Sequence, residues 1–386
     1  MYFPYNYGNK KKEPLYNYIN ISRQNMNSEN YSNLTSTISP RTKLISDDLA
    51  QLFFVVNFVV ICGLVSVFGV TANILNVIVF LRQGFKDRVN ISLFALTVSD
   101  LCSLIALLWI TICFNPLFKF SDIPFMSTEV HYLTGSWPRF LFTRVTGWIT
   151  AFITFERCVC VAAPLKVKTI ITRRRVTVCM AGIVVLVSAS VAPTYYTSRF
   201  GWKYFPARNR TLLGLVFTAD REEIDSVSFI YNNVISALAS FVAVLVCTVV
   251  LVVKLNQKQN WREKSVQVSR QQNQEGTVSA REKKVGKMVT VISVIFIVSF
   301  MPNCFMSVII AEERDFTVTG LQVNVVQVFF SFTWILEALN GSVNIFVYYR
   351  MSTRYRNALI SLLQPSPGDR DKKRDDLNYE ETVDSQ

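Results

Sequence analysis

The sequence predicts an all-α membrane protein, a seven-transmembrane helix bundle with an amphipathic eighth helix on the inner membrane surface. Of its 386 residues, 51% are hydrophobic and only 17% are charged, which is unusual for a soluble domain. The apolar residues fall in runs of about 20 or more, the length that a helix needs to cross a hydrocarbon core of about 30 Å. These runs lack strand-like alternation, and a spanning segment must satisfy its own backbone in lipid.

Seven such stretches define the predicted membrane spans. They cover residues 52–81, 90–114, 131–157, 176–197, 226–253, 287–311 and 321–349. We therefore expect a disordered extracellular tail over residues 1–48 and a seven-helix domain over residues 49–350. An amphipathic helix over residues 351–364 and a disordered cytoplasmic tail over residues 365–386 complete the expected organisation.

The net charge of +13 is concentrated in the loops after the first, third and fifth spans. The positive residues in these loops include Arg82, Lys86, Arg88, Lys166, Lys168, Arg173, Arg174, Arg175, Lys254, Lys258, Arg281, Lys283, Lys284 and Lys287. The loop after the sixth span is acidic instead, with Glu312, Glu313 and Asp315. Because short cytoplasmic loops accumulate Lys and Arg, we expect an N-terminus outside the plasma membrane and no nucleic-acid partner.

Four sequons for N-glycosylation lie in segments that this orientation places outside the cell. They begin at Asn20, Asn30, Asn33 and Asn209. Similar patterns at Asn90 and Asn340 fall at or inside the spans, where we expect no glycan.

The sequence offers no recognisable catalytic or metal-binding chemistry. Its eight cysteines lie within the spans or at their cytoplasmic ends, and the outer loop at roughly residues 198–225 has none. We therefore predict no zinc site and no disulfide that ties this loop down. A phosphate-cradling glycine loop and a nucleophile elbow are also absent from the sequence, so we expect no enzyme.

Several polar residues share one depth when the spans are counted at about 1.5 Å per residue. They are Asn73, Asp100, Thr146, Asn340 and Asn344. One carboxylate among neutral polar groups can form a hydrated cluster that holds a small cation such as sodium. The same residues can equally form a plain hydrogen-bond network between helices. In both cases we expect Asp100 to face the interior.

Three charged residues lie in the outer part of the spans, where unpaired charges are costly. Arg139 and Arg144 are about 27 Å and 20 Å above Arg157 on the third span, and Glu337 is about 17 Å above Tyr348 on the seventh. Depth counting pairs Glu337 with Arg144 better than with Arg139. The pair is either purely structural, or it leaves Arg139 to face an outer cavity and select an acidic ligand.

A second charged pair, Glu156-Arg157, closes the third span at its cytoplasmic end. Glu282 begins the sixth span at the same level, and an Arg–carboxylate pair there can hold two helix ends together as a bistable latch. Alternatively, Glu282 is one solvated charge in the run 281–284.

The segment 350–363 has amphipathic helical spacing. Its basic residues are Arg350, Arg354 and Arg356, and its apolar residues are Met351, Tyr355, Leu359, Leu362 and Leu363. We expect this helix to lie on the inner surface with its basic face toward anionic lipid.

Taken together, these residues resemble the rhodopsin-like family of G-protein-coupled receptors over roughly residues 52–363. Glu156-Arg157-Cys158 resembles that family's E/D-R-Y motif, and Pro164-Leu165 resembles its partner contact in the second inner loop. The run 296–302 resembles F-x-x-C-W-x-P with Phe300 in place of tryptophan, and 344–348 resembles N-P-x-x-Y. Asn73, Asp100 and Tyr355 match single positions of the family.

The stretch around Glu156-Arg157-Cys158 and Pro164-Leu165 is also similar to chemosensory-type receptors of gastropod molluscs. The resemblance implies a receptor that transduces an extracellular chemosensory molecule or peptide to a heterotrimeric G protein, and an Arg139 that faces an outer cavity would make that ligand acidic. It implies a switch and coupling region at Glu156, Arg157, Pro164, Leu165, Glu282 and Tyr348, and a ligand pocket at Arg139, Arg144, Phe300 and Glu337.

The sequence also departs from the family pattern. The family's usual outer disulfide has no cysteine here, since Tyr132 lies near one position and the loop offers none. Helix five lacks its proline and Ile345 replaces the proline of helix seven, so the geometry of both helices is open. Arg139 takes the place where amine receptors carry aspartate, which disfavours a cationic amine. A seven-span transporter or ligand-gated channel is the alternative from another class.

Overall fold

The computed structural model describes residues 43–162, 169–266, 273–316 and 320–364. Seven helical segments within this part of the chain are long and apolar enough to cross a membrane. They are Asp47–Gln83, Arg88–Phe114, Ser127–Ala162, Arg173–Thr197, Arg221–Gln257, Lys283–Ile310 and Val323–Met351. Each overlaps one predicted span, so the fold class is confirmed and the chain is a multi-pass membrane protein.

The second, fourth and sixth spans are each one continuous helix, whereas the first, third, fifth and seventh are each built from several helical elements. In chain order the elements are α3 (Asp47–Phe53), α4 (Cys62–Gln83), α5 (Arg88–Phe114), α6 (Pro116–Lys119), α7 (Ser127–His131), α8 (Trp137–Ala162), α10 (Arg173–Thr197), β1 (Ser198–Phe205), β2 (Arg210–Phe217), α11 (Arg221–Phe229), α12 (Ser236–Val266), α13 (Asn273–Glu312), α14 (Val323–Ser342), α15 (Asn344–Met351) and α16 (Thr353–Leu363). The last helix, α16, lies within the range predicted for the amphipathic helix.

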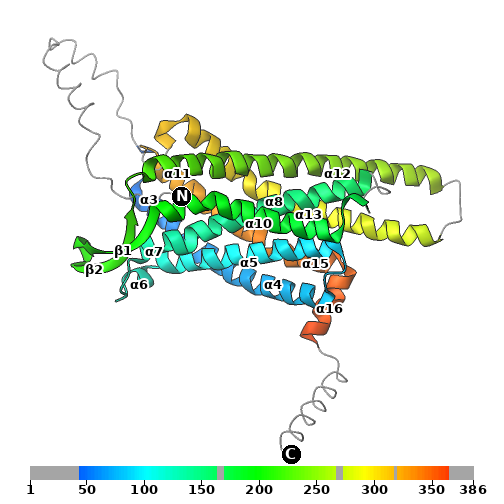
Figure 1. The fold of residues 1–386 in the computed structure, drawn as a ribbon, viewed down its shortest axis with the longest axis horizontal. Helices are drawn as coiled ribbons and strands as arrows, with labels where there is room; N and C mark the ends of the chain where they lie inside the picture. The colour runs from blue at the N-terminus through cyan, green and yellow to red at the C-terminus, as the bar shows by residue number, and fades with distance from the viewer. Residues whose placement is uncertain (1–42, 163–168, 267–272, 317–319, 365–386) are drawn as a thin grey trace, which may run out of the picture.

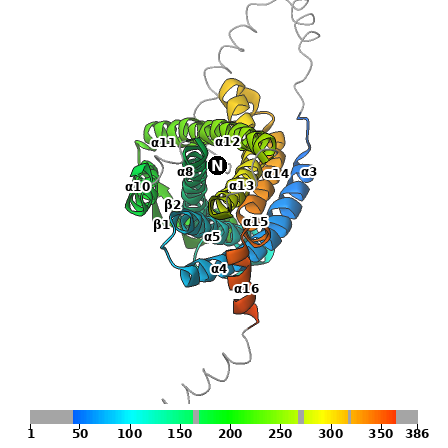
Figure 2. The ribbon, with the colours of Figure 1, turned by 90° about the vertical axis from the view of Figure 1, so that its right-hand side faces the viewer.

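The helices run side by side, with the β1–β2 hairpin at one end of the bundle and α16 at the other (Figure 1). Helix α8 packs against α5, α10, α12 and α13, and it lies inside the ring of helices in the end-on view (Figure 2). The third span is therefore the central helix of the bundle. In the orientation predicted from the loop charges, the hairpin end is the outer end.

The ends of several helices follow from their capping residues. Asp87 precedes α5 and accepts a hydrogen bond from the Val89 amide at 3.1 Å, and Thr172 precedes α10 and accepts one from the Arg175 amide at 3.4 Å. Gly84 ends α4 with φ of 70°, a left-handed conformation that glycine adopts without a steric penalty. These residues therefore set both ends of the first inner loop and the last residue of the second inner loop.

The missing prolines of helices five and seven are replaced by other irregularities. Helix five contains a π-helical turn over Ile230–Ile235, and wider turns of this kind locally change the face that a helix presents. Helix seven breaks at Val343, between α14 and α15, although Ile345 stands where the family has proline. Both helices are therefore irregular without a proline ring.

A β-hairpin forms the outer loop between the fourth and fifth spans. Its strands pair from Ser198–Phe217 to Phe205–Arg210, and Asn209 closes the turn with φ of 49°. The strand β2 is also bonded to the segment before the third span, since the Leu213 amide donates to the Pro124 carbonyl at 3.0 Å. The hairpin is thus held against the outer end of the third span.

Glu129 fastens this contact with a buried carboxylate. Its Oε2 accepts a hydrogen bond from the Leu215 amide at 2.6 Å and lies 2.8 Å from Lys203 Nζ, while the residue is only 3% exposed. All eight cysteines are free, so the hairpin and third span are joined here by a charged contact and no disulfide. We name Glu129, Lys203 and Leu215 the outer clasp.

The outer clasp gives a first prediction. Glu129→Ala should lower the free energy of unfolding by about 3 kcal/mol, because it leaves the buried Leu215 amide without its acceptor and removes the carboxylate that pairs with Lys203. Thermal unfolding of the detergent-purified protein measures this effect. The matched control, Lys203→Met, should cost clearly less, because Glu129 keeps its bond to the Leu215 amide. Equal effects of the two changes would contradict the assignment.

Candidate functional site

The outer part of the bundle contains a buried ion pair between the third and seventh spans. Arg139 Nη2 lies 2.6 Å from Glu337 Oε2, and each side chain is 7% exposed. The Arg139 guanidinium also lies 5.4 Å from the ring centroid of Trp334, within the range of a cation–π contact. Because both charges are buried in the membrane interior, the pair holds α8 and α14 together.

This geometry corrects the pairing that depth counting favoured, which was Glu337 with Arg144. Arg139 and Arg144 are five residues apart, so their side chains leave the helix about 140° apart around its axis. Depth counting ignores this rotation. The face of α8 that carries Arg139 is the one that meets Glu337 on α14.

Arg144 is left without a counter-charge. It is 7% exposed, its Nε is buried without a partner, and it makes no hydrogen bond or ion pair within the described part of the chain. Its guanidinium lies 4.9 Å from the ring centroid of Phe140. The structure therefore reverses the expected roles of the two arginines.

The predicted polar cluster forms in the middle of the bundle around Asp100. Thr146 donates to Asp100 Oδ1 at 2.8 Å, and the Asn344 amide donates to Asp100 Oδ2 at 2.8 Å. Asp100 is 2% exposed and therefore faces the interior. Residues from the second, third and seventh spans thus meet at one carboxylate.

The two other residues of this group have different surroundings. Asn73 donates to the carbonyls of Gly69 and Gly341, both at 2.8 Å, and so joins the first span to the seventh without contacting Asp100 directly. Asn340 lines a cavity of about 20 Å³ together with Asp100 and several neighbours. The full lining is Asp100, Ser103, Leu104, Leu107, Arg139, Thr143, Thr146, Phe300, Glu337, Ala338, Asn340 and Gly341.

Phe300, predicted to line the ligand pocket, borders the same cavity from the sixth span. It is 4% exposed and stacks on Phe296 with ring centroids 4.4 Å apart. The cavity therefore lies between the outer ion pair and the Asp100 cluster.

At the inner end of the third span, Glu156 binds two arginines. Glu156 Oε1 lies 2.6 Å from Arg157 Nη2 and 3.2 Å from Arg88 Nε, and its side chain is 1% exposed. We call these three residues the inner triad. The side chain of Glu282, the predicted latch partner, lies outside the described part of the structure, as do Pro164 and Leu165.

Arg88 was counted in the sequence only as a loop charge, and the structure gives it a specific place. It is the first residue of α5, directly after the cap Asp87, and its Nη1 donates to the Ile171 carbonyl at 2.8 Å. It therefore joins the second span, the third span and the end of the second inner loop. The sequence signal that could have indicated this role is the position of Arg88 in the first turn of a span, where a charge can reach the neighbouring helices.

Tyr348 lies beside this region and is fully buried, with its hydroxyl next to the Thr97 side chain. Its ring contacts Phe80 and Tyr355, with centroids 5.4 Å and 5.5 Å apart. The Tyr355 hydroxyl donates to Asn76 Oδ1, and burial raises the pKa of Tyr355 above its ordinary value. Helices α4, α15 and α16 are thus packed together at the inner end.

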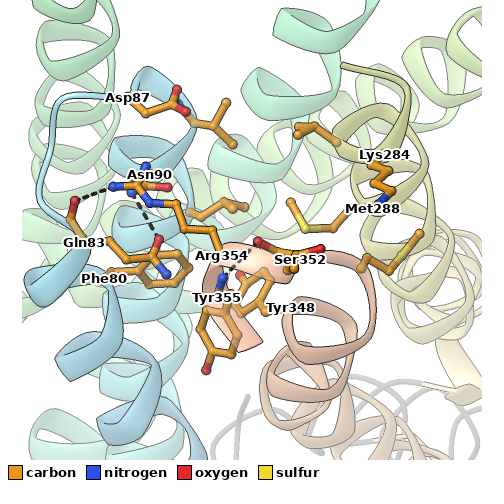
Figure 3. Close-up of a pocket in the computed structure, with 15 residues that line it drawn as sticks. Phe80, Gln83, Asp87, Asn90, Lys284, Met288, Tyr348, Ser352, Arg354 and Tyr355 are labelled. Carbon is orange, nitrogen blue, oxygen red and sulfur yellow. Dashed lines mark hydrogen bonds between the residues drawn. The ribbon is translucent and has the colours of Figure 1, made fainter. Parts of the chain in front are cut away.

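A cavity of about 500 Å³ opens beside these aromatic rings. In Figure 3, Lys284 and Met288 on α13 face Gln83 and Asn90 across the cavity, with Tyr348 and Tyr355 below. Asn90 donates to Gln83 Oε1 at 3.3 Å and is 8% exposed, so its sequon is enclosed. The cavity is large enough to receive a segment of another molecule.

Of the four predicted glycosylation sites, the structure describes one. Asn209 is exposed at the tip of the hairpin, where its Oδ1 accepts a hydrogen bond from the Tyr204 hydroxyl at 2.5 Å. Asn20, Asn30 and Asn33 lie outside the described residues, as do most of the tail predicted over 1–48 and the tail predicted over 365–386.

Comparison with known families identifies one match. Residues 56–365 match the family described as serpentine type 7TM GPCR chemoreceptor Srw. A comparison with curated proteins gave no match. The matched region begins within the first span and extends past α16, so it contains the outer ion pair, the Asp100 cluster and the inner triad.

The outer ion pair gives a second prediction. Glu337→Gln should lower the free energy of unfolding by about 3 kcal/mol, because it leaves Arg139 buried without its counter-charge. The double change Arg139→Met with Glu337→Leu should recover most of this loss. A double-mutant cycle built from Arg139→Met, Glu337→Leu and their combination, followed by thermal unfolding, measures the coupling. Additive effects of the two single changes would contradict a direct pair.

Proposed function

Because the chain belongs to the Srw family of serpentine type 7TM GPCR chemoreceptors, we propose that it transduces an extracellular chemical ligand to a heterotrimeric G protein. This family consists of receptors and not of enzymes. The observation that supports the proposal best is the placement of charges on α8, which carries the outer ion pair near one end and the inner triad at the other.

We place the protein in the plasma membrane with its N-terminus outside, as the Lys and Arg residues of the inner loops favour. Its motifs also support a relation to rhodopsin-like receptors and to gastropod chemosensory receptors. In this orientation the ligand reaches the bundle from the hairpin end and approaches Arg139, Arg144, Phe300 and Glu337. A small chemosensory molecule or a peptide is the proposed ligand.

Signalling in this proposal is a shift between two conformations of the bundle. A ligand that binds one conformation more tightly moves the population toward it, and a nearly complete switch needs about 5.5 kcal/mol of differential binding. At the inner end, Arg157 would leave Glu156 and contact the G protein together with Pro164 and Leu165. Arg88 would then keep Glu156 paired, so that its buried carboxylate is not left alone.

The cavity of about 500 Å³ beside Tyr348 and Tyr355 supports this proposal, because it offers a place where a G protein could bind. It is bordered by α13, by the start of α5 and by Tyr348, and these elements come from three different spans (Figure 3). A displacement of α13 would widen it. We propose that the G protein enters here.

We also propose a sodium ion beside Asp100. The cavity of about 20 Å³ is large enough for one small ion or water, and Asp100, Ser103 and Thr146 offer it oxygen atoms. Thr146 and Asn344 donate to the two oxygens of Asp100 and so hold its carboxyl group beside this cavity. A bound sodium ion would supply a positive charge that stabilises this carboxylate.

Nucleotide exchange tests the receptor proposal directly. Membranes that contain the chain and a heterotrimeric G protein should load GTP analogue faster when a ligand panel is added, while ion flux in the same cells stays unchanged. Ligand-gated flux without nucleotide exchange would instead favour the channel alternative.

The inner triad gives a third prediction. Glu156→Gln should raise ligand-independent nucleotide exchange, about tenfold if the lost pairing is worth about 1.4 kcal/mol, because Arg157 is released. Arg88→Met should give a smaller rise, since Arg157 keeps Glu156. Glu282→Ala is the comparison variant, because the sequence predicts a rise there too. Unchanged exchange in Glu156→Gln at equal surface expression would contradict the switch.

The sodium proposal gives a fourth prediction. Raising sodium at constant ionic strength, with potassium as the replacement, should lower ligand-independent exchange in the native chain. In Asp100→Asn this dependence should disappear, because the amide offers the cation no charge. A sodium effect that persists in the variant would refute the site at Asp100.

A further inference from the structure

We call Arg139, Arg144 and Glu337 the outer charged layer, and together these three residues carry one more positive charge than negative charge. Within this layer, Glu337 is already paired with Arg139 at 2.6 Å. We propose that Arg144 is the residue that binds the anionic group of the extracellular ligand, and that this ligand is a small organic acid with a single carboxylate. The inference rests on the proposed receptor function and specifies its ligand class.

Among the residues that the structure describes, the carboxylates nearest to Arg144 already have other partners. Glu337 Oε2 receives Arg139, and although Arg144 lies within electrostatic reach of Glu337, the two form no ion pair. Asp100 is bonded to Thr146 and Asn344. On the sixth span, the group within electrostatic reach of Arg144 is the Cys304 thiol, which is a poor counter-charge.

The surroundings of Arg144 compensate its charge only in part. The residue is 7% exposed, and its Nε is buried without a partner. The contact with the Phe140 ring at 4.9 Å offers an electrostatic attraction but no hydrogen-bond acceptor. A buried guanidinium without a hydrogen-bond acceptor is strongly disfavoured. An added anion would form the charged hydrogen bonds to Arg144 that no residue of the described chain forms.

The chemistry of the guanidinium defines the anion that fits. Its planar fork of N–H donors matches the two oxygens of a carboxylate, which it can bind through two parallel hydrogen bonds. The excess is one positive charge, so a monoanion neutralises the layer and a dianion would overcompensate it. Arg144 is buried in the bundle, so only a small group can reach its guanidinium without moving the helices around it.

Arg139 is a poor candidate for the same role. A ligand carboxylate would have to displace Glu337 from it, which would leave that buried carboxylate unpaired. Binding at Arg144 leaves the Arg139–Glu337 pair intact. The assignment therefore differs from the expectation drawn from the sequence, in which Arg139 was the free arginine.

Thermal unfolding of the purified full chain tests this assignment without a G protein. Sodium acetate is the probe, acetamide is its neutral analogue, and sodium chloride at equal concentration controls for ionic strength. We expect acetate to raise the melting temperature of the native chain in a saturable way, by about 2 °C or more, and acetamide to have no effect. The absence of an acetate effect in the native chain would overturn the proposal.

Variants locate the effect. In Arg144→Met the acetate effect should vanish, and the melting temperature without acetate should equal or exceed that of the native chain, because an unpaired buried charge is gone. Arg144→Lys should respond weakly, since it keeps the charge but loses the fork. Arg139→Met should melt lower than the native chain, because Glu337 loses its partner. The matched double variant Arg139→Met with Glu337→Leu removes the neighbouring pair, leaves Arg144 without a counter-charge, and should keep the acetate response.

Two outcomes of this series would contradict the inference. One is an acetate effect that persists in Arg144→Met, and the other is a fall in melting temperature for Arg144→Met as large as that for Arg139→Met. The second would make Arg144 a structural partner of Glu337. Nucleotide exchange on the G protein is measured separately. If no ligand stimulates this exchange but acetate still raises the melting temperature, the receptor proposal is contradicted and the anion site at Arg144 stands.

Discussion

The cost of burying arginine in a membrane interior is the constraint on which this structure depends. Helix α8 carries three arginines, at positions 139, 144 and 157, and all three are at least nine-tenths buried. Each needs a carboxylate or an equivalent partner to be tolerated there. The arrangement of the neighbouring spans can be understood from how the chain pairs Arg139 and Arg157 and leaves Arg144 without a carboxylate.

Two of the three arginines are paired inside the chain, and in both cases the pairing joins helices. Glu337 brings the seventh span to the outer part of α8, while Glu156 gathers Arg157 and Arg88 at the inner end and so includes the second span. Between them, Asp100 collects hydrogen bonds from the third and seventh spans. The central helix is thus attached to its neighbours by polar contacts at three depths.

Much of this could be predicted from residue type and spacing. Apolar run length located the seven spans, and counting along the helices placed Asp100, Thr146 and Asn344 at one level, where they are bonded in the structure. Rotation about the helix axis was not predictable in this way, and it reversed the roles of Arg139 and Arg144. The ion pair between Arg88 and Glu156 was not predicted, because a charge at the boundary of a loop is normally solvated. The β1–β2 hairpin and its clasp depend on contacts between distant segments, which local patterns do not encode.

The outer clasp has a consequence for how the protein matures. A loop fastened by a disulfide reaches its final state only after oxidation, and a reductant can release it. The β1–β2 hairpin is instead fastened to the third span by Glu129, Lys203 and a backbone amide, and all eight thiols are free. This end of the bundle is therefore expected to assemble by burial and charge alone, independent of the redox conditions around it.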